Sequence, residues 1–184
     1  IIEEICTWGK WFQLDDYLHE LLQGDLKNVF SVILDRQETD QAYCLISSKY
    51  AVVTVLGLLA YSRLGLSEDC LLRASYYFIE DVWKEVIWLG DLHNMEVQAS
   101  LLEMIHYYTY QLKHFLVFSY KRVSILYDAF QEYCQERYAL YEKAFHIALS
   151  KAFRYNMKKK KDNYKGTTAK YSVEAVISYS EWPY

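Results

Sequence analysis

Apolar residues fill the segment from Ala51 to Tyr61 almost without interruption. The segment reads AVVTVLGLLAY and places apolar residues on nearly every face of a helix. A helix that is hydrophobic all round must be enclosed by other elements. The pattern therefore predicts a central buried helix over residues 41–64, and we expect residues 51–61 to be the most buried part of the protein.

The residues that follow predict a second helix, over 67–89, which packs against the first. Gly65 can end the first helix, and Ser67 can cap the second. Glu68 and Asp69 then place negative charge in the first turn, where the helix dipole favours it. The buried stripe of this helix repeats at intervals of three and four residues. Its members are Leu71, Leu72, Ser75, Tyr76, Ile79, Val82, Trp83 and Val86.

The rest of the chain shows the same helical periodicity. Further helices are predicted over 1–13, 15–23, 25–36, 94–120 and 121–156, with a short helix and a turn within 169–184. A single proline and six glycines supply too little turn chemistry for a sandwich or a barrel of many short strands. We therefore predict an all-α fold, with a bundle of five or six helices up to about residue 120.

Charge divides the chain at about the same place. Residues 1–120 contain 8 Lys and Arg against 17 Asp and Glu, whereas residues 121–184 contain 12 against 7. We infer a helical bundle over 1–120 that folds without the rest, followed by a basic region over 121–184. A basic region favours nucleic acid or an acidic partner. On charge alone, a merely solvated surface explains it equally well.

Cysteine usage and the absence of targeting signals indicate a cytoplasmic protein. The four cysteines are scattered, which is typical of free thiols in a reducing compartment. Glu3 and Glu4 occupy the place where a signal peptide needs positive charge. The apolar run over 51–61 is too short to span a bilayer, so we expect no membrane association. The start at Ile1, without Met, indicates a fragment of a longer product.

Pairs of chemically active residues are few and isolated. Glu103 and His106 have the Glu-x-x-His spacing with which helical di-iron proteins present ligands, but a second such pair is missing. Asp16 and His19 have the same spacing, and they too lack the further ligand pair that such a site needs. Metalloprotease, phosphate-loop and nucleophile-elbow motifs are absent from the sequence. We therefore expect no enzyme activity, no metal and no cofactor.

An aromatic run on the predicted helix over 94–120 could line a pocket for a small apolar ligand. The candidate lining residues are His106, Tyr107 and Tyr110, beside Tyr108 and Phe115. Tyrosines at helical spacing more often pack in a core and direct their hydroxyls to solvent. Both interpretations remain open on the sequence.

The strongest candidate for ligand contact is a basic segment near the end of the chain. Side-by-side lysines can neutralise phosphates without reading any base. The candidate DNA-contacting residues are Ser150, Lys151, Arg154, Lys158, Lys159, Lys160 and Lys161. A run of lysines alone is more often a solvated surface, so its surroundings matter.

These surroundings resemble part of the AraC-type transcriptional regulators. That family shows Leu-Ser-x-x-Phe-Lys in the recognition helix of its first helix-turn-helix, followed by a Tyr and a linker helix. Leu149, Ser150, Phe153 and Arg154 match the first element, and Tyr164 lies at the expected distance. The matches to the linker helix and to the turn after it are Val173, Val176, Ile177 and the segment 179–184.

The upstream part of the chain resembles the all-helical domain that precedes the DNA-binding part in some of these regulators. In those regulators an apolar helix, a Gly-Leu-Ser break and a Ser-x-Tyr-Tyr-Ile helix follow one another, and residues 21–33 and 47–82 resemble this domain. Lys158 replaces a family glycine, and the first helix-turn-helix is shortened before Leu149.

The resemblance implies a transcriptional regulator with a sensory or dimerisation bundle, and we expect a possible homodimer through this bundle. From the charge of the basic segment and the shortened helix-turn-helix, we expect DNA binding that is weak and mostly without sequence preference. Two alternatives remain open. The first is a helical protein–protein interaction module, and the second is a helical bundle that binds a small molecule.

Overall fold

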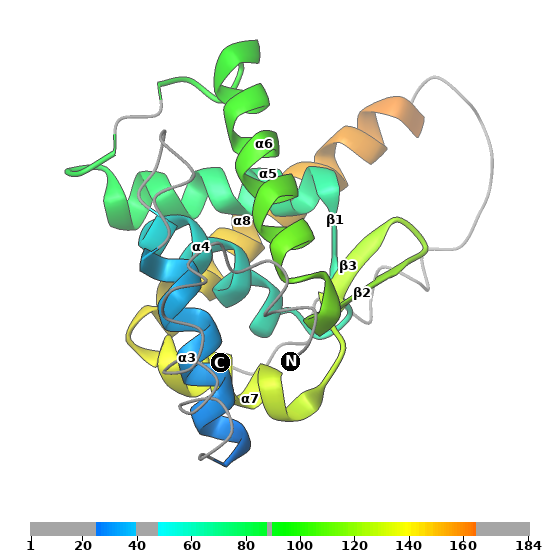
Figure 1. Cartoon of the computed structure of the whole chain (residues 1–184). Coiled ribbons are helices and arrows are strands. Elements are labelled where there is room, and N and C mark those ends of the chain that lie inside the picture. The colour runs from blue at the N-terminus through cyan, green and yellow to red at the C-terminus, as the bar shows by residue number, and fades with distance from the viewer. Residues whose placement is uncertain (1–24, 40–47, 88–89, 165–184) are drawn as a thin grey trace.

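The computed structural model describes residues 25–39, 48–87 and 90–164. This part of the chain is mostly helical and carries one small sheet (Figure 1). The helices are α3 (Leu26–Thr39), α4 (Ser48–Ala60), α5 (Glu68–Phe78), α6 (Met95–Gln111), α7 (Asp128–Arg137) and α8 (Glu142–Tyr164). The strands are β1 (Leu66–Ser67), β2 (Leu116–Ser119) and β3 (Arg122–Ile125). The predicted all-α class is confirmed, and the helices predicted over 1–13, 15–23 and 169–184 lie outside the described residues.

Helix α4 is the centre of the molecule. Every residue from Ala51 to Ala60 is buried, and Tyr61 is half-buried. Helix α4 contacts each of the other described helices, namely α3, α5, α6, α7 and α8. Burial of its apolar side chains on all faces is the main stabilising contribution that this segment makes. The predicted central helix is therefore confirmed over the described residues.

Helix α5 begins as the sequence predicts. The Ser67 hydroxyl accepts a hydrogen bond from the backbone N–H of Cys70 at 3.3 Å, and Glu68 and Asp69 occupy the first turn. Regular α-helix ends at Phe78, however, and a π-helical segment η2 (Ile79–Trp83) follows. The predicted stripe is buried as far as Ile79, whereas Val86 is exposed beyond the helix.

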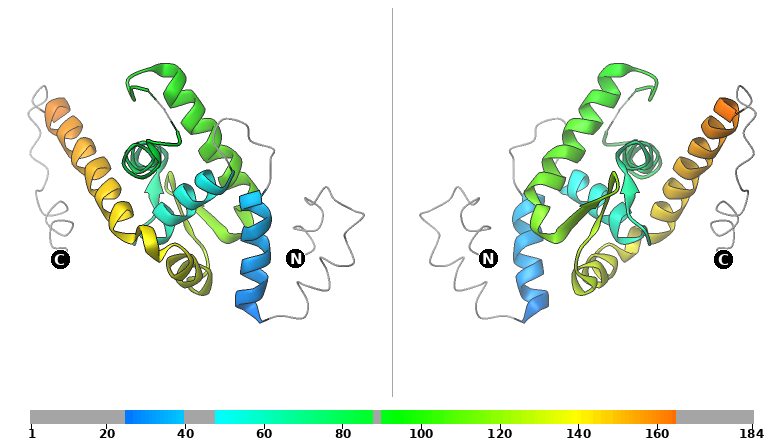
Figure 2. Two further views of the ribbon diagram at one scale, coloured as in Figure 1. Left: turned by 90° about the vertical axis from the view of Figure 1, so that its left-hand side faces the viewer. Right: turned by 90° about the vertical axis from the view of Figure 1, so that its right-hand side faces the viewer.

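Helix α8 packs along α5, and the two form the most extensive helix pair of the described chain. Phe145 of α8 stacks on Phe78 of α5, with ring centroids 4.4 Å apart. Gly57 of α4 makes room for the same ring, because a Cβ at Gly57 would lie 2.0 Å from Cζ of Phe145. Figure 2 shows α8 along one outer edge of the molecule and α3 along the other.

The sheet corrects the prediction of unbroken helix over 94–120 and 121–156. Helix α6 ends at Gln111, a 3₁₀ turn η3 (Lys113–Phe115) follows, and β2 and β3 then form an antiparallel hairpin. Strand β1 pairs with β3, which gives the strand order β1-β3-β2. The segments LVFS and RVSI are rich in β-branched and aromatic residues, which favour strands. The helical prediction overlooked this short-range preference.

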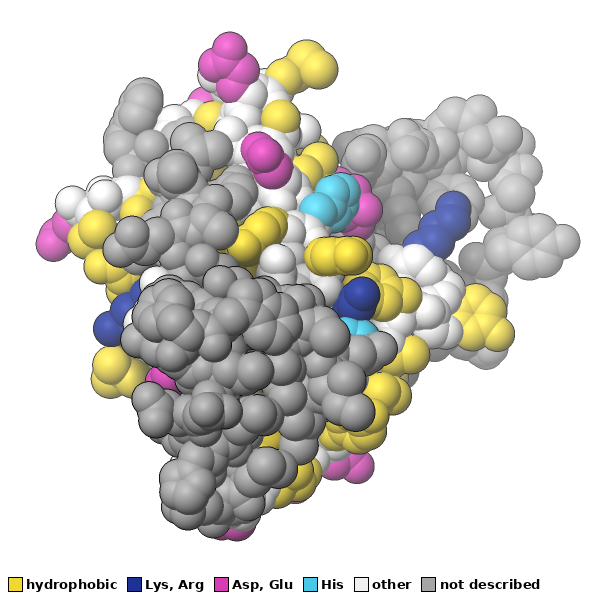
Figure 3. All heavy atoms as spheres, viewed as in Figure 1, with side chains coloured by type: hydrophobic (Ala, Val, Ile, Leu, Met, Phe, Trp, Pro, Cys, Tyr) yellow, Lys and Arg dark blue, Asp and Glu magenta, His cyan; other side chains and the backbone are white. Residues whose placement is uncertain are grey.

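The hairpin turn has an unusual backbone. Tyr120 and Lys121 both have positive φ angles, 48° and 63°, and neither is glycine. In a two-residue hairpin loop, positive φ angles at both positions match the right-handed twist of the two strands, which favours this conformation here. Tyr120 is 97% exposed, so its side chain gains no burial in return. Figure 3 shows hydrophobic side chains at the surface on this side of the molecule, over the hairpin.

Helices α3 and α7 are joined by a charged cluster. Arg137 of α7 forms ion pairs with Asp35 at 2.5 Å and with Glu38 at 3.0 Å, both on α3. The Tyr138 hydroxyl donates a hydrogen bond to Glu38 at 3.0 Å. Burial alone would lower the pKa of the Arg137 guanidinium, but its hydrogen bonds to Glu38 and Asp35 raise that pKa overall.

One hydrophobic core crosses residue 120. Phe130, Phe145 and Leu149 belong to the same buried cluster as Phe30 and Leu56. Residue 120 itself lies in the hairpin turn. The described residues on the two sides of the predicted domain boundary therefore share their core.

Within the described residues, we find no helix whose length and hydrophobicity would let it cross a lipid bilayer.

Candidate nucleic-acid interface on helix α8

Helix α8 has one face fixed in the core. Its buried residues are Phe145, Ala148, Leu149 and Ala152, spaced by three, one and three. This spacing places them on one side of the helix, against α5 and α4. The opposite side of α8 therefore points to solvent.

Cations occupy this outer side. Lys143, Ser150, Lys151 and Arg154 are exposed. The whole helix contains seven Lys and Arg against two Asp and Glu. The run 158–161 continues the same helix, at register positions that follow Arg154 by four to seven residues. The side chains of residues 158–164 lie outside the described part of the structure.

The three described cations of α8 have no acidic partner among the described residues. Lys143 and Arg154 make no ion pair or hydrogen bond with any described residue. The ammonium group of Lys151 lies 5.9 Å from the ring centroid of Tyr77, a weak cation–π contact. Their positive charge is therefore available to an anionic ligand.

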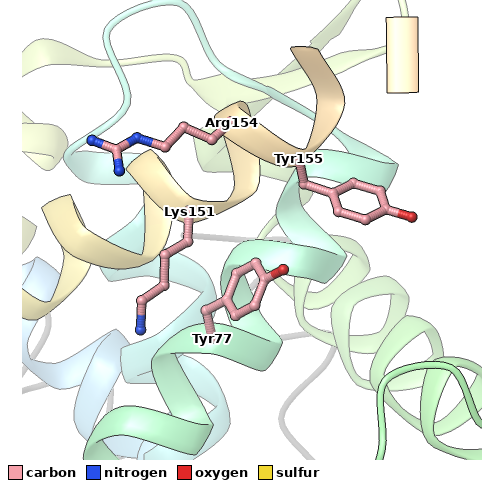
Figure 4. A pocket seen from close by; sticks show the side chains of 4 residues that line it. All are labelled: Tyr77, Lys151, Arg154 and Tyr155. Atoms are coloured by element: carbon pink, nitrogen blue, oxygen red, sulfur yellow. The ribbon is translucent and has the colours of Figure 1, made fainter. Parts of the chain in front are cut away.

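A shallow pocket of about 240 Å³ opens beside these cations. It is lined by Tyr77 of α5 and by Lys151, Arg154 and Tyr155 of α8. Figure 4 shows the hydroxyl groups of Tyr77 and Tyr155 pointing in the same direction, while the Arg154 side chain extends the opposite way. The pocket thus combines two aromatic rings with two cations.

Arg73 holds one wall of the pocket in place. Its guanidinium carbon lies 3.8 Å from the ring centroid of Tyr155. Asp69 fixes the guanidinium from the other side, by accepting hydrogen bonds of 3.2 and 3.1 Å. Burial lowers the pKa of Arg73, but the hydrogen bond to Asp69 outweighs this effect and raises the pKa overall. Arg73 is therefore already paired with an acidic side chain, whereas Arg154 has no acidic partner among the described residues.

The aromatic pocket predicted on α6 stays a prediction. His106 is exposed and lies 3.4 Å from a carboxylate oxygen of Glu68. Tyr107 packs edge-on against buried Tyr108, with ring centroids 5.0 Å apart. Tyr110 is 64% exposed, and the Lys113 ammonium lies 4.7 Å from its ring centroid. The structure thus places His106 and Tyr110 on the surface of α6.

Other candidate groups are dispersed. No group of three or more His, Cys, Asp and Glu side chains with metal-binding geometry occurs in the described residues. Cys70 and Cys134 are buried free thiols. Burial raises the pKa of Cys70 to about 11 and also raises that of Cys134, so both thiols are protonated at neutral pH. Cys6, Cys44 and the pair Asp16–His19 lie outside the described part.

The segment that resembles a recognition helix does not begin a helix of its own. Helix α8 runs unbroken through Leu149, seven residues after its start at Glu142. Leu149 is buried, whereas Phe153 is 43% exposed. The segment matched to the linker helix and its turn, 173–184, lies outside the described residues.

Tyr155 could be predicted from the sequence, where Tyr155 and Tyr164 are interleaved with the basic segment, but Tyr77 was missed. Tyr77 follows Tyr76 on α5 and lies beside the buried stripe, so only packing of α8 against α5 makes it part of a pocket. Lys143 could have been found from sequence, because it precedes Arg154 by eleven residues, which is close to three whole helical turns.

Comparisons of the chain with protein-family models, with curated proteins and with solved structures found no match.

Proposed function

We propose that the chain is part of a transcriptional regulator whose helix α8 contacts the DNA backbone. The observation that supports this proposal most strongly is the outer face of α8. There, exposed cations without acidic partners follow one another along a helix whose opposite face is fixed in the core. The AraC-type resemblance of the same segment adds an independent reason.

The contact would be electrostatic. Lys143, Lys151 and Arg154 can each neutralise a phosphate, and the Ser150 hydroxyl can donate to a phosphate oxygen. The run 158–161 adds four lysines to the same helix. Release of condensed counterions then drives binding, which falls steeply as salt rises.

Sequence selectivity is not expected from α8 alone. A recognition helix reads bases through residues near its N-terminus, which must enter the major groove. The first turn of α8 instead leads directly into Phe145, which is buried against α5 and α4. The expected binding is therefore non-specific, with a Kd on the order of 10⁻⁴ to 10⁻⁶ M at physiological salt.

The test is fluorescence anisotropy with labelled duplex DNA over a range of salt concentrations. A variant carrying Lys143→Gln, Lys151→Gln and Arg154→Gln should bind more weakly on every sequence. Its salt slope should be shallower by up to about 3, since each neutralised phosphate contributes about 0.9. Thermal melting checks that the variant folds.

The matched control carries Lys84→Gln, Lys113→Gln and Lys121→Gln. These lysines are also exposed, lie outside α8 and change the total charge by the same amount. The control should retain the affinity and slope of the unmodified chain more closely than the α8 variant. Equal losses in both variants, or no DNA binding at low salt, would contradict the proposed function.

A further inference from the structure

The pocket between α5 and α8 has the chemistry of a small-ligand site. Its four lining residues supply two aromatic rings and two cations, and none is a carboxylate. Its volume of about 240 Å³ is below the range typical of drug-sized ligands, which favours a ligand with a single ring.

The cations define the charge of the ligand. Arg154 makes no ion pair within the described chain, and Lys151 has only the distant ring of Tyr77. The nearby carboxylate of Asp69 is engaged by Arg73. An anionic group in the pocket would therefore meet Lys151, and also Arg154 once that side chain turns from its position in Figure 4 toward the two rings, and no lining residue is acidic.

The two aromatic rings of the pocket define the shape of the ligand. Tyr77 and Tyr155 are half-buried, and their hydroxyl groups point in the same direction (Figure 4). Because Arg73 stacks on Tyr155 at 3.8 Å, this ring is held in position before any ligand binds. Rigid aromatic walls reduce the entropy lost on binding and favour a flat partner.

We propose that this pocket binds a single-ring aromatic anion. The ring lies against Tyr77 and Tyr155. The anionic group contacts Lys151, and the Arg154 side chain turns toward the pocket to make the second contact. A second consequence rests on the proposed function: DNA phosphates use the same two cations, so the ligand and DNA exclude one another. The pocket is then a regulatory site, at which the ligand releases the protein from DNA.

Binding is tested by NMR titration of the full chain at constant ionic strength with phenyl phosphate, inorganic phosphate and phenol. Phenyl phosphate should bind with a Kd in the millimolar range, on the order expected for a ligand of this size in an open site. It should bind at least fivefold more tightly than either of the other two compounds. The shifted amides should lie on α5 and α8, around Tyr77 and Tyr155.

Two variants separate the ring from the charge. Tyr77→Leu should weaken phenyl phosphate about fivefold, as expected at the low end for loss of one stacking partner. Lys151→Gln should weaken both phenyl phosphate and inorganic phosphate. Lys151 is exposed, so this variant tests the site even if Tyr77→Leu fails to fold. Tyr127→Leu, at an exposed tyrosine that precedes α7, should leave phenyl phosphate binding unchanged.

Competition is measured by adding phenyl phosphate to the protein–DNA complex. At ten times the Kd of the ligand, the apparent Kd for DNA should rise at least fivefold, toward the limit of about elevenfold set by full exclusion. If phenyl phosphate binds no better than inorganic phosphate, the proposal that this pocket binds an aromatic anion is overturned. Phenyl phosphate that binds without changing DNA affinity would overturn the exclusion. A chain that binds phenyl phosphate but no DNA would overturn the proposed function and the exclusion, and would leave the pocket standing.

Discussion

At the scale of single residues, the contact between Gly57 and Phe145 determines how closely α8 approaches α4. The Phe145 ring occupies the space where a side chain at position 57 would begin. It also stacks on Phe78, at an interplanar angle of 12°. One aromatic ring thus connects α4, α5 and α8, and a glycine in a buried helix is the condition for this contact.

Gly57→Ala should destabilise the protein by about 1–3 kcal/mol, although alanine favours helices more than glycine does. The added methyl group would overlap the Phe145 ring, and overpacking of this kind outweighs the gain in helix propensity. Urea denaturation measures the change in the free energy of unfolding. In a Phe145→Leu background, the cost of Gly57→Ala should shrink, because the two changes are coupled. A cost that is equal in both backgrounds would show that the ring can move aside.

At the scale of elements, the sequence predicts helices with strong local signals and misses those features that depend on packing. Helix α4 could be predicted because nearly every position over 51–61 is apolar, and the start of α5 because Ser67 and Glu68 form a cap signal. The hairpin was missed because the apolar pattern of 95–112 continues into β2, and no Asn-Gly or Gly-Gly marks the turn. The pocket could not be predicted, since it exists only where Tyr77 meets α8.

The hairpin should become more stable when its turn receives residues that adopt positive φ readily. Changing Tyr120 to Asn and Lys121 to Gly should raise the free energy of unfolding by about 1 kcal/mol, because L-residues with side chains resist this conformation and Asn-Gly prefers it. Chemical denaturation is again the measurement. Phe118→Asn, at an exposed strand position, serves as the control and should not stabilise the protein. A destabilised turn variant would mean that the Tyr120 side chain makes a favourable contact.

At the scale of the whole molecule, helices from both ends of the described chain enclose α4. Helix α7 also caps the C-terminal end of α4. The side-chain amides of Gln131 and Gln135, both on α7, donate hydrogen bonds of 2.8 Å to the carbonyl of Ala60. The division at residue 120 reflects a real change in charge, but the core continues across it. Charge composition and folding unit are thus separate properties of this chain.

A chain that ends at residue 120 should fail to fold cooperatively, contrary to the expectation from charge and pattern alone. It would lose Phe130, Phe145 and Leu149 from the core and would expose one side of α5 to water. Circular dichroism during heating should show a broad, shallow transition. A chain that ends at residue 164 keeps every described element and should melt cooperatively. Cooperative melting of the shorter chain would establish residues 1–120 as an independent domain.

The length of α8 sets how much DNA it can follow. From Lys143 to Lys161 the helix rises about 27 Å, at 1.5 Å per residue. This rise corresponds to about eight base pairs of duplex, at 3.4 Å per pair along each strand. Helix α8 is straight, whereas the phosphate backbone winds around the axis of the duplex. One copy of the chain would therefore contact less than one helical turn of DNA. A longer footprint on DNA would therefore need a second α8, carried by another copy of the chain.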